Sequence, residues 1–405
     1  MKHSNIWQSK TQEKWSKMNL ESAMRPLHYT SRFLGLNISG KLNRVYALSI
    51  LLIFCAIIYS SSTNLCNLIC SENGVNNFIL WIQYIANTLF VFVVIISTLI
   101  KPLQFAFPHE DLRMIDRNFR YIGVNFSDKH VFKIQLLQVI ISILTPMLFG
   151  WRDVKMSIHL KSINAVLYYL HYYYAVTISM VTDFLFVNYL GIIKIRYSHL
   201  NHLITQLVEE KLSPPVSFSN LSQRQLLWRD DNSYVFYKIK KIRRLHHDLF
   251  SLSMKINKNF GICILVNSTI SLIIITGQLY ANYYSFNGSV IDMDLIVYNL
   301  LWTLYYTFRL VFVSYACHRT QNEANMASLI LCGISLPSKA MQDEVLLFSL
   351  QLMQENLIFT ACDFFNIDLT MLSSVVSTIT TYLVILIQLD RTKESSEDTN
   401  TQKHF

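Results

Sequence analysis

Seven segments of the chain are long and apolar enough to cross a lipid bilayer, and no other feature constrains the fold as strongly. A helical crossing needs about 20 mostly apolar residues. Only 15% of the residues are charged, whereas a soluble protein carries about 25%. Strand-like alternation is absent, which argues against a membrane β-barrel. We therefore predict an all-α, polytopic membrane protein with seven transmembrane helices. The predicted spans are residues 45–60, 78–100, 131–149, 163–190, 259–281, 292–317 and 367–389.

The basic residues are distributed unevenly between the two sides of the membrane that seven crossings define. Lys and Arg number 27 on the side of the N-terminal segment and 6 on the opposite side. The positive-inside rule discounts long loops, and 15 against 6 remain without the loop between spans 4 and 5. We predict a cytoplasmic N-terminus and an extracellular C-terminus. The net charge of +9 then reflects topology and contact with anionic membrane lipid, and does not indicate nucleic acid.

This orientation is the reverse of that of a G-protein-coupled receptor, which is one alternative class. A secondary transporter is another, but neither internal repeats nor Gly/Pro-broken helices are evident. No phosphate loop, metal-ligand set or nucleophile with a base is present, so we expect neither an enzyme nor a cofactor. His199 and His202 are three residues apart, but no further metal ligand is near them in the sequence. Cys66 and Cys70 could pair across one helical turn, although unpaired thiols are favoured.

The last span carries one polar stripe on an otherwise aliphatic helix. At about 100° per residue, Thr381 and Gln388 differ by only about 20° in azimuth. Ser374, Ser377 and Thr378 extend the same stripe toward the start of the helix. Such a stripe can join helices through hydrogen bonds in lipid, or it can line water. The residues alone leave both interpretations open.

Aromatic and hydrogen-bonding residues gather in the outer halves of spans 4, 5 and 6. "YYLHYYY" (168–174) belongs to span 4, and the tyrosines, tryptophan and arginine of span 6 follow at i, i+4, i+7 and i+11. Aromatic walls with a few polar groups are typical of a small-molecule pocket, and an interfacial aromatic belt is the alternative. For His171 we expect a polar group satisfied by a neighbouring Tyr, with ligand contact or pH sensing as alternatives. The candidate ligand-binding residues are Tyr168, His171, Tyr172, Gln278, Asn282, Asp294, Tyr298, Trp302 and Tyr305.

Two charges lie inside the spans, Asp183 in span 4 and Arg309 in span 6. Intramembrane charges are rare and usually paired. Both belong to the inner halves of their spans under the predicted orientation. We therefore predict an ion pair beneath the candidate pocket, serving as a structural or gating contact; ligand contact by Arg309 is the alternative.

The helical periodicity of spans 4 and 5 continues beyond the membrane. Leu200, Leu203 and Leu207 extend span 4, and Leu245 to Ile256 lead into span 5, which predicts a cytoplasmic helical hairpin. A third amphipathic helix is predicted at 341–359. Its apolar face would comprise Leu346, Leu350, Met353 and Leu357. Uncovered apolar faces favour self-association, and a membrane-surface position is the alternative for 341–359.

"TYLVILIQL" at 381–389 resembles the signature of insect gustatory receptors: Thr-Tyr, five hydrophobic residues, then Gln-Phe. The resemblance extends over the whole chain in length and seven-span layout. It is strongest over 234–389, including "LHHDLFSLSMKINKNFG" (245–261) and "FTACDFFNIDL" (359–369). Thr381, Tyr382 and Gln388 match the motif. Leu389 replaces the family's Phe.

The resemblance implies a ligand-gated, non-selective cation channel that assembles as a homotetramer or heterotetramer. Span 7 would line the pore, with Gln388 and Leu389 at its narrow outer end. The implied partners are a small-molecule tastant, permeating cations and membrane lipid, and the implied location is the plasma membrane of chemosensory neurons. The tastant is a bitter compound or a sugar such as fructose, because parts of the sequence also resemble the fructose-receptor-related branch. The candidate pore and gate residues are Ser374, Thr381, Ile385, Gln388 and Leu389.

The expected organisation follows from the spans and this resemblance. The cytoplasmic extensions would form an anchor that holds the tetramer. The expected regions are a cytoplasmic N-terminal segment (1–44), spans 1–4 (45–190), a first anchor part (191–258), spans 5–6 (259–318), a second anchor part with the amphipathic helix (319–366), the pore-lining span (367–389) and an extracellular tail (390–405).

Overall fold

The computed structural model describes residues 20–36, 41–62, 74–101, 104–126, 129–160, 163–212, 221–287, 293–331 and 339–401. Within these ranges the chain is helical, apart from short connections and an isolated bridge between Thr360 and Asn366. Cys66, Cys70 and the turn between the two long helices lie outside the described residues. The helices are α2 (Leu20–Ala23), α3 (Arg25–Phe33), α4 (Lys41–Ser62), α6 (Gly74–Ile100), α7 (His109–Tyr121), α8 (Lys129–Leu160), α9 (Ile163–Leu212), α10 (Leu221–Asn287), α11 (Met293–Leu331), α12 (Lys339–Gln354) and α13 (Thr370–Thr401).

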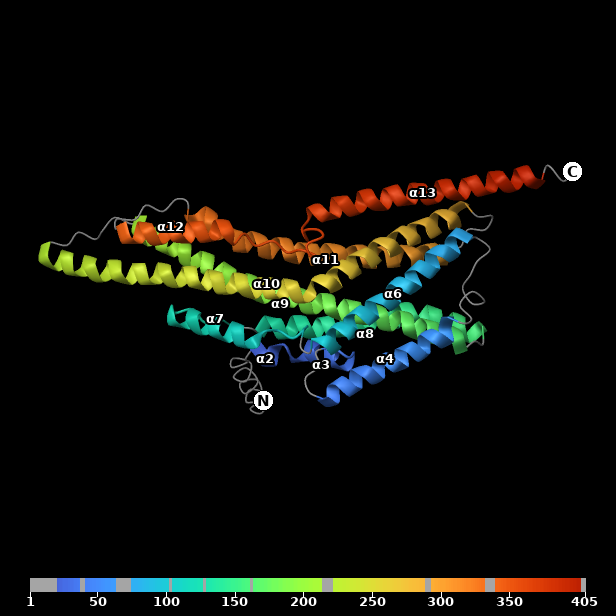
Figure 1. The fold of residues 1–405 in the computed structure, drawn as a ribbon, viewed down its shortest axis with the longest axis horizontal. Helices are drawn as coiled ribbons and strands as arrows, with labels where there is room; N and C mark the ends of the chain where they lie inside the picture. The colour runs from blue at the N-terminus through green and yellow to red at the C-terminus, as the bar shows by residue number, and fades with distance from the viewer. Residues whose placement is uncertain are drawn as a thin grey trace, which may run out of the picture.

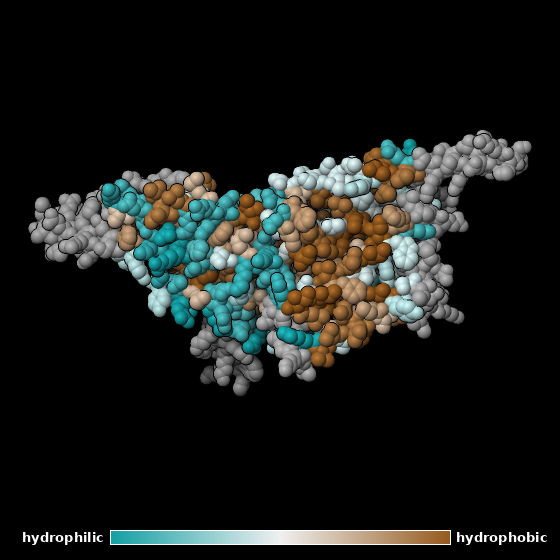
Figure 2. Space-filling model, in the orientation of Figure 1, coloured by the Kyte–Doolittle hydropathy of each residue, from teal (hydrophilic) through white to brown (hydrophobic). Residues whose placement is uncertain are grey.

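Seven of these helices are long and apolar enough to cross a membrane, which confirms the predicted number of spans. They are α4, α6, α8, α9, α10, α11 and α13. Each overlaps one predicted apolar segment. On the face shown in Figure 2, the coloured residues divide into a hydrophobic half and a hydrophilic half.

The two halves are joined by helices that run through both. α9 has 50 residues and α10 has 67, so they are about 75 and 100 Å long at the rise of an α-helix. Their ends beyond the predicted spans lie beside α7 and α12 in the hydrophilic half (Figure 1). The continued periodicity of the sequence therefore corresponds to unbroken helices.

α9 is the central helix of the protomer and α13 lies at its edge. α9 packs against α4, α6, α8, α10 and α11. α13 lies along the outside of the bundle, where it contacts chiefly α10 and, to a lesser extent, α11 (Figure 1). The position of α13 leaves most of its surface uncovered.

Several helices differ from their predicted extents; α11 and α13 run on to Leu331 and Thr401, past the predicted span ends at 317 and 389. α8 continues to Leu160, well past the predicted end at residue 149, and Pro146 lies inside the helix without ending it. α12 ends at Gln354, so Leu357 belongs to the following linker, where it is buried. The side chains that α12 buries are Met341, Glu344, Phe348 and Leu352, whereas Leu346, Leu350 and Met353 of the predicted apolar face are exposed on the protomer.

Candidate functional site

Trp302 of α11 lies at the centre of an aromatic cluster contributed by α8, α9 and α11. It is 1% exposed. Aromatic rings with centroids about 4.5–7 Å apart attract one another in tilted and edge-to-face arrangements. The centroid of Trp302 lies 4.4 Å from that of Phe149, 5.4 Å from Tyr172, 5.6 Å from Tyr305, 5.9 Å from Tyr306, 6.2 Å from Tyr173 and 6.3 Å from Tyr298. The structure thus brings together four of the predicted ligand-binding residues, from α9 and α11.

Asp153 supplies the polar edge of this Trp302 cluster. The hydroxyls of Tyr173 and Tyr298 donate to its Oδ2 at 2.6 and 2.8 Å. The guanidinium carbon of Arg152 lies 4.3 Å from the centroid of the Tyr298 ring. Sequence reasoning missed Asp153 because it follows the predicted end of span 3. The adjacent Arg and Asp at the end of an apolar span were the available signal.

Tyr168 and His171 lie in a neighbouring group against α6. Tyr84 of α6 has its ring centroid 6.0 Å from that of Tyr168 and 4.7 Å from that of His171. The Nε2 atom of His171 lies 3.0 Å from the Thr88 hydroxyl. His171 is therefore a buried, hydrogen-bonded side chain, but its partner is Thr88 and not the expected Tyr.

The three remaining predicted ligand residues differ in burial. Asn282 is 5% exposed, and neither polar atom of its amide has a partner among the described residues; the same holds for Oε1 of Gln278. A buried polar atom without a partner costs about 1–3 kcal/mol, so these amides are suited to bind water or a ligand. Asp294 is exposed in the first turn of α11, about 12 Å along the helix from Trp302, and does not join the buried cluster.

Asp183 and Arg309 form a buried ion pair between α9 and α11. Arg309 donates to Asp183 Oδ2 from Nε at 2.8 Å and from Nη2 at 2.5 Å, and Asn267 of α10 donates to Oδ1 at 2.9 Å. The Arg309 guanidinium carbon lies 5.8 Å from the centroid of the Tyr305 ring. A cavity of about 10 Å³, room for one water, lies beside the pair and reaches Met371 of α13. The pair therefore lies between Tyr305 of the aromatic cluster and Met371 in the first turn of α13.

Most of the polar stripe of α13 faces away from its own protomer, whereas Thr378 is half-buried and lines, with Ser374, a groove against α10. Ser374, Ser377, Thr381 and Gln388 are exposed, and so are Ile385 and Leu389. Ile379, Leu383 and Leu386 lie on the opposite side of the helix, where Ile379 joins the core and the two leucines pack on Tyr280 of α10. Tyr382 of the motif is 53% exposed. A groove of about 430 Å³ separates the first turns of α13 from α10, and Ser374 lines it.

The linker from α12 to α13 is fixed to two helices of the bundle. Asn325 of α11 exchanges hydrogen bonds with the backbone of Leu357, at 3.1 and 2.9 Å. Asn257 of α10 bonds the backbone and the hydroxyl of Thr360. A Cβ on Gly261 would lie 3.2 Å from the Cys362 backbone nitrogen, so the glycine permits this close approach. These contacts join the two sequence segments in which the family resemblance is strongest.

Asp368 begins α13. Its Oδ1 atom accepts hydrogen bonds from the backbone nitrogens of Thr370 and Met371 at 2.9 and 3.0 Å, as a helix N-cap does. A carboxylate at this position also interacts favourably with the positive end of the helix dipole. The start of the helix is therefore set by an acidic cap.

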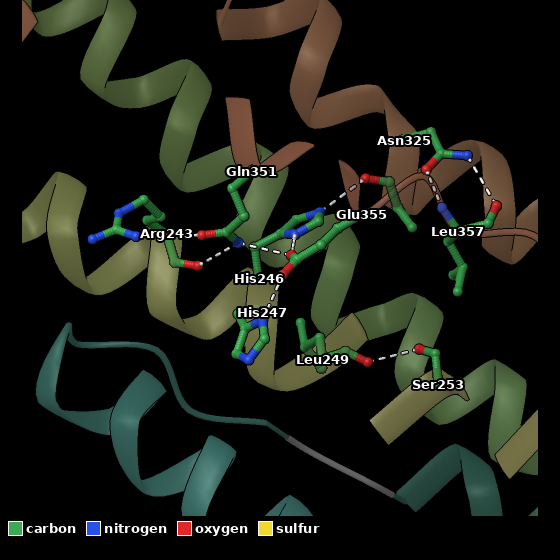
Figure 3. Close-up of polar contacts among 10 residues, drawn as sticks. Arg243, His246, His247, Leu249, Ser253, Asn325, Gln351, Glu355 and Leu357 are labelled. Carbon is green, nitrogen blue, oxygen red and sulfur yellow. Dashed lines mark hydrogen bonds and ion pairs between the residues drawn. The ribbon is translucent and has the colours of Figure 1, made fainter. Parts of the chain in front are cut away.

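A second polar network joins α10 to the end of α12 (Figure 3). Glu355 accepts from Gln351 at 2.8 Å and contacts Nδ1 of both His246 and His247. Burial raises the pKa of Glu355, yet these hydrogen bonds lower it more, and the net pKa lies below its usual value. We find here a fixed carboxylate just before the linker to α13.

Comparison with known proteins identifies the family. The profile of the 7tm chemosensory receptor family matches residues 24–392, and the chain belongs to that family. Relatives from Drosophila melanogaster include gustatory receptor 23a, with 32% identity over 40% of this chain and 43% of the relative. The gustatory receptor for sugar taste 43a has 28% identity over 38% of this chain and 36% of the relative. The gustatory receptor for bitter taste 66a has 24% identity over 46% and 36%.

These alignments span less than half the length of each curated relative. The solved structures extend the likeness to the whole fold. The insect olfactory receptor OR5 from Machilis hrabei matches 91% of this chain and 98% of its own, with a TM-score of 0.58 and 12% sequence identity. The same receptor in complex with eugenol gives a TM-score of 0.54. At this identity the likeness establishes the fold, and the family match makes the chain a multi-pass membrane protein of the chemosensory receptor family.

Proposed function

We propose that this protein is a gustatory receptor that acts as a ligand-gated, non-selective cation channel in the plasma membrane of chemosensory neurons. The observation that carries this proposal is the outward-facing polar stripe of α13. The hydroxyls of Thr378 and Thr381 bond backbone carbonyls of their own helix, but an exposed glutamine amide facing lipid would be left without water or another polar partner, which is costly. Several copies arranged around an axis would turn the stripe toward water and supply polar neighbours.

We further propose assembly as a homotetramer, or as a heterotetramer with related receptors, and the same exposed surface supports this proposal. The exposed Leu346, Leu350 and Met353 of α12 offer a second uncovered apolar face, in the proposed anchor formed by residues 191–258 and 319–366. Apolar faces of this kind are covered in oligomers. In such an assembly Gln388 and Leu389 would border the outer end of the pore, and dewetting by Leu389 could gate it.

The Trp302 cluster is our proposed tastant site. A ligand entering it would displace packed aromatic rings and could bond Asp153, which already accepts from two of the tyrosines. Arg309 lies against Tyr305 and pairs with Asp183 beside Met371. That chain of contacts offers a direct path from an occupied cluster to α13.

We propose two candidate chemical classes for the tastant. Aromatic faces suit the C–H surfaces of a sugar such as fructose, and equally the rings of a bitter plant compound. The relatives named for sugar taste and for bitter taste match similar shares of the chain, so similarity favours neither.

Cysteine accessibility along α13 tests the channel proposal. Thr381→Cys lies on the stripe and Thr380→Cys lies about 100° away from it; both positions are exposed on the protomer. Currents would be recorded from cells expressing each variant against a panel of sugars and alkaloids. A water-soluble thiol reagent should block current through Thr381→Cys and spare Thr380→Cys. Equal block of both variants, or of neither while agonist current persists, would reject the stripe as the pore wall.

A further inference from the structure

The hydrophilic half contains a cleft within the proposed anchor, to which the channel proposal assigns no ligand. It lies between α7 and α10 next to α12, and has a volume of about 930 Å³, within the range of small-molecule sites. Lys240, Lys241, Arg243 and Arg244 line it, against a single carboxylate, Asp248. The cleft is therefore strongly positive.

Three of these cations are available to a ligand. Arg243 is engaged, because its Nε donates to Glu344 at 2.7 Å. In the described part of the structure, no carboxylate oxygen lies within 4.0 Å of Lys240, Lys241 or Arg244. These three side chains lie within about 100° of one another around α10. They present one face of uncompensated positive charge to the cleft.

Two exposed aromatic rings accompany the cations. The Nζ atom of Lys241 lies 4.5 Å from the centroid of the Tyr121 ring and 5.8 Å from that of Tyr237. These rings are 74% and 62% exposed. Exposed aromatic rings bind nucleotides by stacking on the base, and neighbouring cations neutralise the phosphates. The side-chain amide of Asn118 adds a hydrogen-bonding group to the same wall.

The position of the cleft along α10 favours a soluble ligand. Lys241 precedes the predicted start of span 5 at residue 259 by 18 residues, which is about 27 Å along the helix. A lipid headgroup at the bilayer surface does not reach that far. The cations therefore face a water-filled region.

We propose that this cleft is a binding site for a small soluble polyphosphate, with Lys240, Lys241 and Arg244 holding the phosphates and Tyr121 and Tyr237 stacking on a base. Nucleoside triphosphates and inositol polyphosphates share the phosphate chemistry, and the rings favour the nucleotide. The site is separate from the proposed pore and tastant cluster. The proposal rests on the fold alone and holds or fails independently of channel activity.

Equilibrium binding to the purified full-length protein in detergent tests the site. Radiolabelled ATP and inositol hexakisphosphate are the two probes, since both carry phosphates and only ATP carries a base. We expect saturable binding of ATP. The triple variant Lys240→Gln/Lys241→Gln/Arg244→Gln should weaken it by about tenfold or more, because each exposed charge contact contributes a factor of a few.

A matched variant controls for the loss of general positive charge. Lys133→Gln/Lys258→Gln/Arg319→Gln removes three exposed basic groups outside the cleft and should leave ATP binding unchanged. Tyr121→Ala/Tyr237→Ala should weaken ATP and spare inositol hexakisphosphate. Saturable binding of inositol hexakisphosphate alone, lost in the cleft triple variant, would assign the phosphate site to that class. Absence of saturable binding of both probes, or equal loss in the two triple variants, would overturn the proposal.

Discussion

α9 and α13 are both apolar enough to cross a membrane, but they occupy opposite environments in the protomer. In α9, 83% of the most apolar stretch is buried. Among the described side chains of α13, only Ile379 is buried. Hydropathy therefore predicts which helices cross the bilayer but does not distinguish a helix at the centre from one at the edge. Burial makes the distinction: most of the apolar stretch of α9 is packed inside the protomer, whereas Ser374, Thr381 and Gln388 of α13 are exposed.

The largest effect is expected at the ion pair that joins the central helix α9 to α11. Asp183→Asn or Arg309→Met leaves one buried charge without its partner, which costs about 3–5 kcal/mol. We expect loss of folded protein, measured as melting temperature in detergent and as surface expression. Exchanging the two charges (Asp183→Arg with Arg309→Asp) should recover part of that loss. A double variant no better than the single variants would show that the contact is not what stabilises α9.

A smaller effect is expected at the polar edge of the Trp302 cluster, beside α9. Asp153→Asn removes the charge that two tyrosine hydroxyls bond, and charged hydrogen bonds contribute about 1.5–3 kcal/mol. Agonist potency should fall about tenfold, measured as the concentration that gives half-maximal current. Asp294→Asn is the matched control, because Asp294 is an exposed aspartate outside the cluster. Equal shifts in both variants would argue against the cluster as the ligand site.

Substitution of Glu355, which lies just before the linker to α13, tests how firmly that linker is held. Its folded-state pKa is lowered, so its interactions stabilise the protein above the ordinary pKa near 4.5 and are lost as the pH falls through the folded value. Glu355→Gln should cost about 1 kcal/mol at neutral pH and flatten the fall of melting temperature below pH 4.5. A variant whose melting temperature keeps the same acid dependence would place that dependence on other carboxyls.

The smallest effect on stability is expected on α13 itself. Gln388→Ala removes an exposed side chain, so surface expression should be unchanged and stability should change by less than about 0.5 kcal/mol. Single-channel conductance or ion selectivity should change, measured in patches. Loss of assembly instead would show that Gln388 joins helices and does not line water.

Much of this arrangement could be predicted from local patterns. The seven spans follow from hydropathy, and the contact of Asp183 with Arg309 follows from the cost of unpaired charge in lipid. The stripe from Ser374 to Gln388 follows from the helical period. The N-cap at Asp368 and the apolar faces of the long helices are equally local.

Other features depend on packing that periodicity does not record. Asp153 was missed because α8 continues past its apolar segment. The burial of Glu344 in α12 depends on its bond to Arg243 of α10, which the pattern of α12 does not reveal. The partner of His171 is Thr88, which belongs to α6 and not to the tyrosine-rich run of α9. Each outcome was decided by a neighbour that is remote in sequence.

The hydrogen-bonded linker between α12 and α13 sets how the last helix is rotated about its own axis, and therefore which side chains face outward. Asn325, Asn257 and Gly261 hold the chain from Leu357 to Cys362, and the Asp368 cap fixes where helical winding begins. Each residue added within the first turn of α13, after the cap, would rotate everything beyond it by about 100°. The stripe would then turn from the open side toward its flank, while the composition of the span stayed the same. We therefore expect selection to hold fixed the number of residues between this linker and the motif at 381–388, and not the motif alone.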